Sequence, residues 1–292
     1  MKRTYNLTVK NQHLIDLFKI HLATLGYSQN NQNTIPVSAS EFLEQIQQRG
    51  IFYLHQVKPR HIREHYAYLC QRPNRTRPGG LCSAVINHYL YAIRLFLAFL
   101  EQTGRITENP ISGLTFPKPV STPREILMQP EISLLYDNCK SLRDRAMLSI
   151  FYGCGLRKSE GAALNIKDVQ FRTGLLYVRE GKGKKRRAVP MSGQVIEDLK
   201  NYVHNERYAT AGETAIITNY LGIRMTGTSC NGILKQIVER AGIKKVISLH
   251  CLRHSIATHL LENGLSVEYV RDFLGHKHLE STQIYTRVNK AL

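Results

Sequence analysis

The chain has 292 residues, with 40 lysines and arginines against 22 aspartates and glutamates, a formal net charge of +18. A hydrophobic fraction of 42% with 21% charged residues is enough to build a packed core, which excludes intrinsic disorder as the main state. The basic excess is shared: residues 1–119 hold 14 basic and 6 acidic side chains, and residues 120–292 hold 26 and 16. We therefore expect both halves to meet one polyanion, a nucleic acid rather than a membrane surface.

The sequence gives little indication of export, of a membrane-spanning helix or of a site built from cysteines. The most apolar stretch, residues 89–100, contains Arg94 and is shorter than the roughly 20 residues that a spanning helix needs. Basic residues at the N-terminus are not followed by an apolar segment, so we expect a cytoplasmic protein. The cysteines form no C-x-x-C pair, which predicts reduced, mostly buried thiols and neither a metal site nor a cofactor; they are Cys70, Cys82, Cys139, Cys154, Cys230 and Cys251.

The first third of the chain predicts a helical bundle. Four helices are expected, over residues 11–25, 38–50, 59–69 and 83–102. In the first, Leu14, Phe18 and Leu22 lie on one stripe. The second is expected to begin at Ser38, because Glu41 three residues later completes a capping box.

A proline-rich segment divides the chain. Residues 109–123 (NPISGLTFPKPVSTP) contain four prolines and predict a linker between a domain over 1–108 and a domain over 124–292. In the second region, helices are expected at 130–138, 141–153, 192–207, 229–241, 250–263 and 266–274, and strands at 174–179 and 187–190. The fold class predicted is mostly α with a small β-sheet, an N-terminal helical bundle followed by an α+β domain.

Four segments of the second region concentrate polar residues. They are GCGLRKSE (153–160) with Arg157 at a helix start, GKGKKRR (181–187) with Lys182 in a turn between strands, HCLRH (250–254), and GHKH (275–278), which is followed by Tyr285. Taken singly, each segment also fits a purely structural interpretation, such as a surface arginine, a solvated basic hairpin or a tyrosine that packs in the core. The glycines around Lys182 lack phosphate-loop spacing, and HCLRH lacks the glutamate of a zinc protease motif.

Together, the six residues Arg157, Lys182, His250, Arg253, His276 and Tyr285 resemble the active-site set of the tyrosine recombinase (phage integrase) family. GLRKSE, the basic hairpin, SLHCLRHSIATHLLENG and FLGHKHLESTQIYTRV all resemble family segments, most of all those of Xer-type and mobile-element integrases. Residues 81–110 look like the end of the family's helical core-binding domain, which is SAM-like. The resemblance implies a tyrosine recombinase catalytic domain over 124–292.

The resemblance also implies a role for each residue. Arg157 and Arg253 would neutralise the scissile phosphate, because a guanidinium stays charged and bonds two oxygens in one plane. Tyr285 would attack phosphorus to form a 3′-phosphotyrosine, with His250 as general base, Lys182 as the acid for the 5′-oxygen, and His276 on a phosphoryl oxygen. Glu160 is expected only to support an arginine.

The partner implied is a double-stranded DNA recombination site held between two basic domains, with a homotetramer or heterotetramer acting on two sites. Phosphate contacts are expected from Lys58, Arg60, Arg63, Arg72, Arg75, Arg77, Lys184, Lys185, Arg186 and Arg187. Seven residues follow Tyr285, fewer than in many relatives, so how neighbouring protomers are coupled stays open.

The function predicted is site-specific DNA recombination through a Holliday junction, without metal or ATP, in integration, excision, inversion or dimer resolution. One alternative is an enzyme of related chemistry, a type IB topoisomerase or a resolvase. Another is a DNA-binding accessory protein that has lost catalysis. The intact six-residue set disfavours the accessory protein, and the Xer-like motifs disfavour the topoisomerase.

Overall fold

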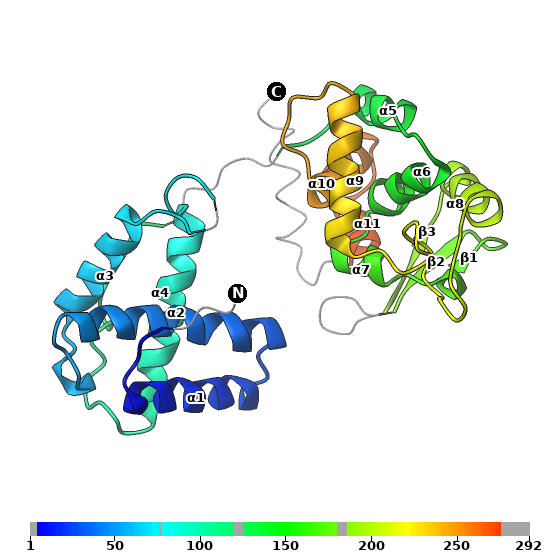
Figure 1. Ribbon diagram of the computed structural model, residues 1–292. Coiled ribbons are helices and arrows are strands. Elements are labelled where there is room, and N and C mark those ends of the chain that lie inside the picture. The colour runs from blue at the N-terminus through cyan, green and yellow to red at the C-terminus, as the bar shows by residue number, and fades with distance from the viewer. Residues whose placement is uncertain (1–4, 76, 119–124, 180–185, 276–292) are drawn as a thin grey trace. The chain divides into compact units, whose positions relative to one another are not determined.

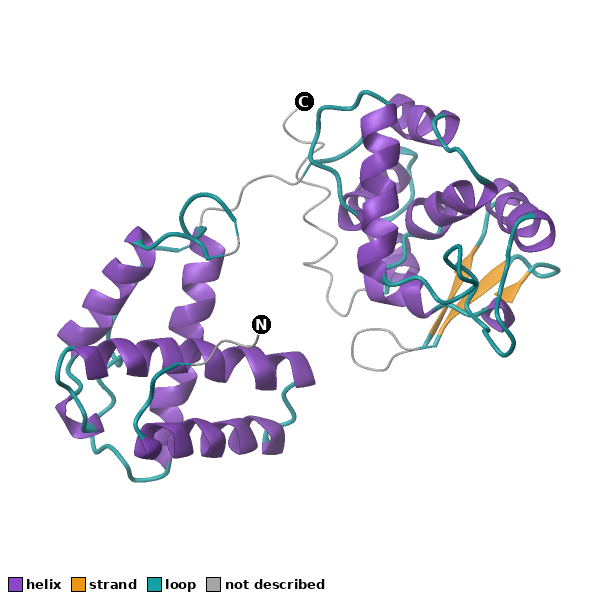
Figure 2. Ribbon diagram, in the orientation of Figure 1, coloured by secondary structure: helices purple, strands orange, loops and turns teal. Residues whose placement is uncertain are grey.

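Two separately packed units make up the chain, Met1–Thr122 and Pro123–Leu292. The computed structural model (Figure 1) describes residues 5–75, 77–118, 125–179 and 186–275. Helices dominate both units, and the only sheet among the described residues belongs to the second unit (Figure 2). This agrees with the predicted fold class.

The described residues of the first unit form four α-helices, α1 (Val9–Thr24), α2 (Gln29–Gln48), α3 (Pro59–Gln71) and α4 (Ser83–Gln102), with a 3₁₀ turn at Leu54–Gln56. Aromatic side chains fill its centre, where the Phe18 and Phe96 rings pack edge to face with their centroids 5.3 Å apart. Both rings are fully buried, and such pairs add about 0.5–1.5 kcal/mol to the burial of their area. The apolar stripe predicted on the first helix is confirmed by the burial of Leu14, Phe18 and Leu22.

Helix α2 begins nine residues before the predicted start at Ser38, so that prediction was wrong. Its N-cap is Ser28, whose hydroxyl accepts the backbone N–H of Asn31 at 3.4 Å. Ser40 in the helix interior donates its hydroxyl to the carbonyl of Pro36 at 2.9 Å. A proline in a helix removes one backbone donor but does not have to end the helix when packing holds both sides, and residues on both sides of Pro36 are buried.

Helix α4 is the one helix among the described residues that is long and apolar enough to cross a membrane by length and composition alone. In this protein it is a core helix. It contributes nine buried residues, including Ile93, Phe96 and Leu100, and packs against the other three helices of its unit.

The start of the predicted linker belongs to the first unit. Ile106 and Ile111 are buried in the same hydrophobic cluster as α1, α2 and α4. Ile111, near the start of the predicted linker, thus packs with the bundle, and residues 109–118 contain no helix, as the prolines led us to expect.

The second unit contains seven α-helices among its described residues. They are α5 (Gln129–Asp137), α6 (Leu142–Leu148), α7 (Lys158–Ala163), α8 (Gly193–Asn205), α9 (Gly227–Arg240), α10 (Leu249–Glu262) and α11 (Val267–Leu274). Strands β1 (Val169–Gln170), β2 (Leu175–Val178) and β3 (Arg187–Pro190) form an antiparallel sheet in the order β1-β2-β3. The short strand β1 was not predicted, and a 3₁₀ turn at Ile166–Asp168 precedes it.

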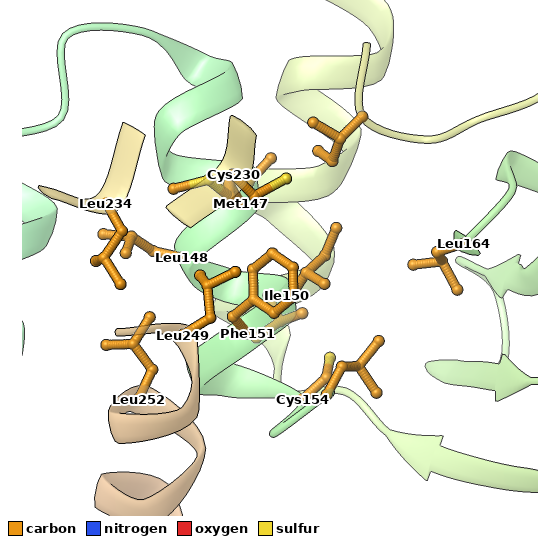
Figure 3. Packing of buried hydrophobic residues seen from close by; sticks show 14 of the residues in the cluster. Met147, Leu148, Ile150, Phe151, Cys154, Leu164, Cys230, Leu234, Leu249 and Leu252 are labelled. Atoms are coloured by element: carbon orange, nitrogen blue, oxygen red, sulfur yellow. The ribbon is translucent and has the colours of Figure 1, made fainter. Parts of the chain in front are cut away.

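Helix α6 and the π-helical turn that follows it, Ser149–Gly153, form the centre of the second unit. Figure 3 shows Phe151 and Ile150 of this turn beside Leu249 and Leu252 of α10. A single helix was predicted over 141–153. In the structure this segment is an α-helix that becomes π-helical at Ser149, before the segment that carries Arg157. π-Turns are common near functional sites because they redirect the chain that follows.

All six cysteines are free thiols. Cys154 and Cys230 are buried and lie in the core of the second unit, whereas Cys70 and Cys82 are exposed. The expectation of mostly buried thiols is therefore met only in part.

Candidate active site

Arg157 lies at the N-cap of α7, directly after a tight turn. Gly155 has φ of +58°, and a Cβ there would lie 3.0 Å from Leu274 and 3.3 Å from Ile256. Only glycine allows this backbone to approach α10 and α11 so closely. The turn therefore places Arg157 beside the ends of two helices that are more than 90 residues away in the chain.

Glu160 is the acidic centre of the site. Its carboxylate accepts the Arg157 backbone N–H at 2.9 Å and the Arg157 Nη1 at 2.6 Å. Arg187 donates Nη1 to Oε1 at 3.0 Å and Nη2 to Oε2 at 2.9 Å, and Arg253 Nη1 lies 3.9 Å from Oε2. One buried carboxylate is thus shared by three guanidinium groups.

This arrangement keeps Glu160 ionised. Burial alone would raise the pKa of its carboxyl, but the hydrogen bonds and charge of Arg187, with the bonds from Arg157, lower that pKa to about 2. The predicted supporting role of Glu160 is confirmed for Arg157. Its contacts with Arg187 and Arg253 were not expected.

His250 and Arg253 both lie near the N-terminus of α10, one helical turn apart. His250 is exposed, whereas the side chain of Arg253 is only 4% exposed. Arg253 donates Nη1 to the carbonyl of Gly155 at 2.5 Å. The structure therefore brings Arg157 and Arg253 to one place through Glu160 and the Gly155 turn.

The three arginines also hold the C-terminal end of α11. Each donates to a different carbonyl of three successive residues: Arg187 Nε to Phe273 at 3.3 Å, Arg253 Nη2 to Leu274 at 2.6 Å, and Arg157 Nη2 to Gly275 at 3.0 Å. The last carbonyls of a helix lack N–H partners within it, and cations are favourable at this end of the helix dipole. The arginines therefore fix the point from which the chain continues to His276.

Arg187 was expected to contact DNA, and in the structure its guanidinium is paired within the protein. Its side chain is 12% exposed, and both of its terminal nitrogens are bonded to Glu160. Arg186 is exposed and lines a hollow of about 480 Å³ together with Lys167, Arg179 and part of Arg187. The charge of Arg187 is paired with Glu160, although its side chain also borders this hollow.

Five of the predicted residues lie outside the described part of the chain. They are Lys182, Lys184, Lys185, His276 and Tyr285. Their roles stay predictions.

In the first unit, several predicted phosphate contacts are exposed around α3. Lys58 is its N-cap, and Arg60 and Arg63 lie in its first two turns. Arg75 and Arg77 follow the helix and are also exposed, with Arg75 Nη2 3.6 Å from Glu41. A helix N-terminus adds a partial positive charge, so this surface favours anions.

Arg72 was also expected to contact phosphate, and its side chain is buried among partners of its own unit. Its side chain is 5% exposed, its Nε lies 2.8 Å from Glu41 Oε1, and its Nη2 donates to the hydroxyl of Tyr89 at 2.9 Å. Tyr89 in turn donates to Glu41 Oε2 at 3.0 Å. Arg72 therefore neutralises a buried carboxylate inside the helical unit and does not face a ligand.

Within the described ranges, no group of three or more histidine, cysteine, aspartate or glutamate side chains is placed to hold a metal ion. The chemistry that the described residues offer is instead that of two arginines converging at the start of α7, with a histidine one turn before the second arginine. Such a set suits an anionic oxygen cluster like that of a phosphodiester.

Comparison with known proteins identifies the family. The model of the phage integrase family matches residues 125–291. The tyrosine recombinase XerD of Oceanobacillus iheyensis is 37% identical over 220 residues, which is 73% of this chain and 74% of that protein. The tyrosine recombinase XerC of Chlamydia trachomatis is 35% identical over 214 residues, 71% of this chain and 68% of its own length.

Solved structures show the same fold at lower identity. The Tn1549 transposon integrase in complex with a circular intermediate DNA has a TM-score of 0.74 and 18% identity, over 93% of this chain and 94% of that one. The XerH recombinase bound to a palindromic difH substrate has a TM-score of 0.73 and 20% identity, over 96% and 82%. The family match covers nearly the whole second unit, and the curated relatives match more than two thirds of the chain. This chain therefore belongs to the phage integrase family of tyrosine recombinases.

Proposed function

We propose that this protein is a site-specific DNA recombinase that cuts and rejoins DNA strands through a 3′-phosphotyrosine intermediate. The observation that carries the proposal is the convergence of Arg157 and Arg253 on the buried carboxylate of Glu160, beside the end of α11. The relatives named XerC and XerD support it.

Arg157 and Arg253 hold the phosphate in this mechanism. A phosphodiester gains negative charge on its nonbridging oxygens as a nucleophile adds, and two fixed positive groups stabilise that charge more than the ground state. Arg157 is the more open of the two, with 20% of its side chain exposed against 4% for Arg253. We assign the first phosphate contact to Arg157.

The chemical steps use four further side chains. The hydroxyl oxygen of Tyr285 attacks phosphorus, and its proton passes to His250. The bond from phosphorus to the 5′-oxygen breaks, Lys182 protonates that oxygen, and His276 donates a hydrogen bond to a phosphoryl oxygen. One ester replaces another, so a free 5′-hydroxyl of a second strand can reverse the step and reseal DNA without ATP.

DNA contacts from both units hold the duplex. The exposed cations around α3, namely Lys58, Arg60, Arg63, Arg75 and Arg77, form one phosphate-contacting surface. In the second unit Arg186 contributes with Lys184 and Lys185. These charges position the protein on DNA and do not read its sequence.

Exchange of two strands needs two cut sites, so we propose that the protein acts as a tetramer on two DNA sites, through a Holliday junction. It would act in the compartment that contains the DNA, the cytoplasm.

A strand-transfer assay tests this function against its alternatives. Duplexes made from inverted repeats that flank the coding sequence are incubated with the protein in EDTA and without nucleotide. Recombinant products that join two duplexes are expected. Relaxation of supercoils without exchange would indicate a topoisomerase, and binding without any cleavage would indicate an accessory protein.

A further inference from the structure

We propose that Arg187 is a positioning residue for the cleavage reaction, acting through Glu160 on Arg157. The inference rests on the proposed function for its activity readout, but the geometry that carries it lies wholly within described residues. It assigns to Arg187 a role other than the DNA contact expected from its place in a basic hairpin.

The alternation of side chains along strand β3 places Arg187 on the buried face of the sheet. Arg187 pairs with Val178 and Val189 pairs with Leu176 across the sheet. Alternate residues of a strand face the same side, and Val189 is fully buried while Ala188 and Pro190 are exposed. Arg187 therefore shares the buried face with Val189, and its guanidinium reaches Glu160 on α7.

The contact between Arg187 and Glu160 is a fork with two parallel bonds, at 3.0 and 2.9 Å. A two-bond arginine–carboxylate pair fixes the plane of the carboxylate as well as its position. The other bonds of Glu160 go to the backbone N–H and Nη1 of Arg157. Arg187 thus orients the group that orients Arg157.

This link has a consequence for catalysis. Without Arg187, the carboxylate of Glu160 would lose the fork that fixes its plane. Arg157, whose backbone N–H and Nη1 are bonded to that carboxylate, would then no longer be held in one position. A displacement of about 1 Å in such a group lowers rates by about 100-fold.

Arg187 also touches the end of α11. Gly275 has φ of +65°, and a Cβ there would lie 2.7 Å from Arg187 Cδ. Its Nε donates to the carbonyl of Phe273 at 3.3 Å. One side chain therefore joins β3, α7 and the C-terminal end of α11.

The test uses Arg187→Met, which keeps much of the apolar stem and removes the fork, and Arg187→Lys, which keeps the charge without the fork. Arg145→Ala is the matched control. Arg145 also pairs with a buried carboxylate of this unit, Asp198, through Nε at 2.8 Å, but it lies between α6 and α8, away from the site. If Arg187→Met does not fold, the lysine variant carries the test.

Single-turnover cleavage on saturating nicked DNA and DNA affinity at several salt concentrations are measured for each folded variant. We expect cleavage by the Arg187 variants to fall by about 100-fold, with affinity and its salt dependence unchanged. Adding Glu160→Gln to Arg187→Met should lower the rate by a smaller factor than Glu160→Gln does in the unmodified protein, because both changes break the contact between Arg187 and Glu160. Arg145→Ala should cleave like the unmodified protein.

Two results would overturn the proposal. One is an unchanged cleavage rate per folded molecule. The other is weaker binding with a salt slope reduced by about 0.9, the mark of a lost phosphate contact.

Hydrogen exchange tests the positioning role without an activity measurement. The Arg157 amide, which donates to Glu160, should exchange faster in the Arg187 variants and not in Arg145→Ala. If the unmodified protein forms no adduct, the proposed function fails, and unchanged exchange at Arg157 separately refutes the positioning role.

Discussion

Arg157 Nη2 donates to the carbonyl oxygen of Gly275 at 3.0 Å, a hydrogen bond between residues 118 positions apart. It joins the first arginine of the proposed site to the residue that ends α11. Because His276 follows directly, the position of the arginine and the start of the segment leading to Tyr285 are mechanically coupled.

Gly275→Ala should lower both stability and cleavage. An alanine in the left-handed backbone conformation costs about 1–2 kcal/mol of stability. The added Cβ would also lie 2.7 Å from Arg187 Cδ, so the arginine side chain that holds Glu160 has to move. Cleavage per folded molecule should fall by at least about tenfold, measured in single-turnover assays beside thermal unfolding.

Gly242→Ala is the matched control for that change. Gly242 has φ of +67°, but nothing lies within 4 Å of the position its Cβ would take. It should lose similar backbone stability and cleave normally. Equal cleavage by the two variants would show that contact between Gly275 and Arg187 is unimportant.

Arg72→Met should destabilise the first unit without weakening DNA binding. The change removes the nearest guanidinium partner of the buried carboxylate of Glu41 and leaves Arg75 Nη2 at 3.6 Å. Removing one member of a buried pair costs about 3–5 kcal/mol, and Arg75 should reduce that cost. Adding Glu41→Gln should restore much of the loss, as urea unfolding of the single and double variants would reveal.

The comparison variant for Arg72 is Arg63→Ala, on the exposed face of α3. It should leave stability nearly unchanged, weaken DNA binding at all sequences and reduce the salt slope by about 0.9. If folded Arg72→Met instead loses affinity in the same way, then Arg72 contacts phosphate in the DNA complex.

Lys182→Ala should show a cleavage defect that depends on the leaving group. General acids contribute about 10²–10⁴-fold, so the variant should be slow on ordinary DNA. A 5′-bridging phosphorothiolate leaves without a proton and should restore most of the rate. A defect that is equal on both substrates would remove Lys182 from the acid role.

His65 should make the first unit less stable in mild acid. Burial, with the positive charges of Arg72 and Arg49, lowers the pKa of its ring from 6.5 to about 3. Between these values the unfolded chain binds more protons than the folded one, so stability falls as the pH falls. From pH 7 to pH 5 the loss for this group is about 2 kcal/mol, measurable by urea unfolding.

His65→Leu tests the source of that pH dependence. The variant removes the titrating ring, so the difference in unfolding free energy between pH 7 and pH 5 should shrink by about the same 2 kcal/mol. His61 and His259, whose pKa values are also lowered by burial, keep a smaller dependence. An undiminished pH effect in His65→Leu would assign the acid sensitivity to other groups.

Most helices of this fold could be predicted from local signals, and the failures have physical causes. Ser83–Gln102 and Arg187–Pro190 match their predicted bounds, since apolar periodicity and turn residues mark both ends. The early start of α2 was missed because Pro36 and Ser38 resemble a helix beginning, whereas tertiary packing keeps them inside the helix. Strand β1 has only two residues, too few to produce a periodic pattern.

The residue types and their order along the chain suggested the six catalytic residues, but they did not indicate which basic side chains are buried. Arg72 and Arg187 carry the same charge as their exposed neighbours, and only long-range partners distinguish them: Glu41 lies 31 positions from Arg72, and Glu160 lies 27 positions from Arg187. One signal was available for Arg187. Its two-residue spacing from the apolar Val189 in a predicted strand places it on the inner face.

Covalent trapping on a nicked suicide substrate tests the central claim most directly. The nick lets the short 5′-hydroxyl strand leave, so that a phosphotyrosine accumulates. In EDTA and without nucleotide, the unmodified protein should form a denaturant-resistant adduct whose DNA is attached to the tryptic peptide 278–287, which contains Tyr285, and Tyr285→Phe should form none. An adduct that survives Tyr285→Phe, or the absence of any adduct with the unmodified protein on its own site, would contradict the mechanism.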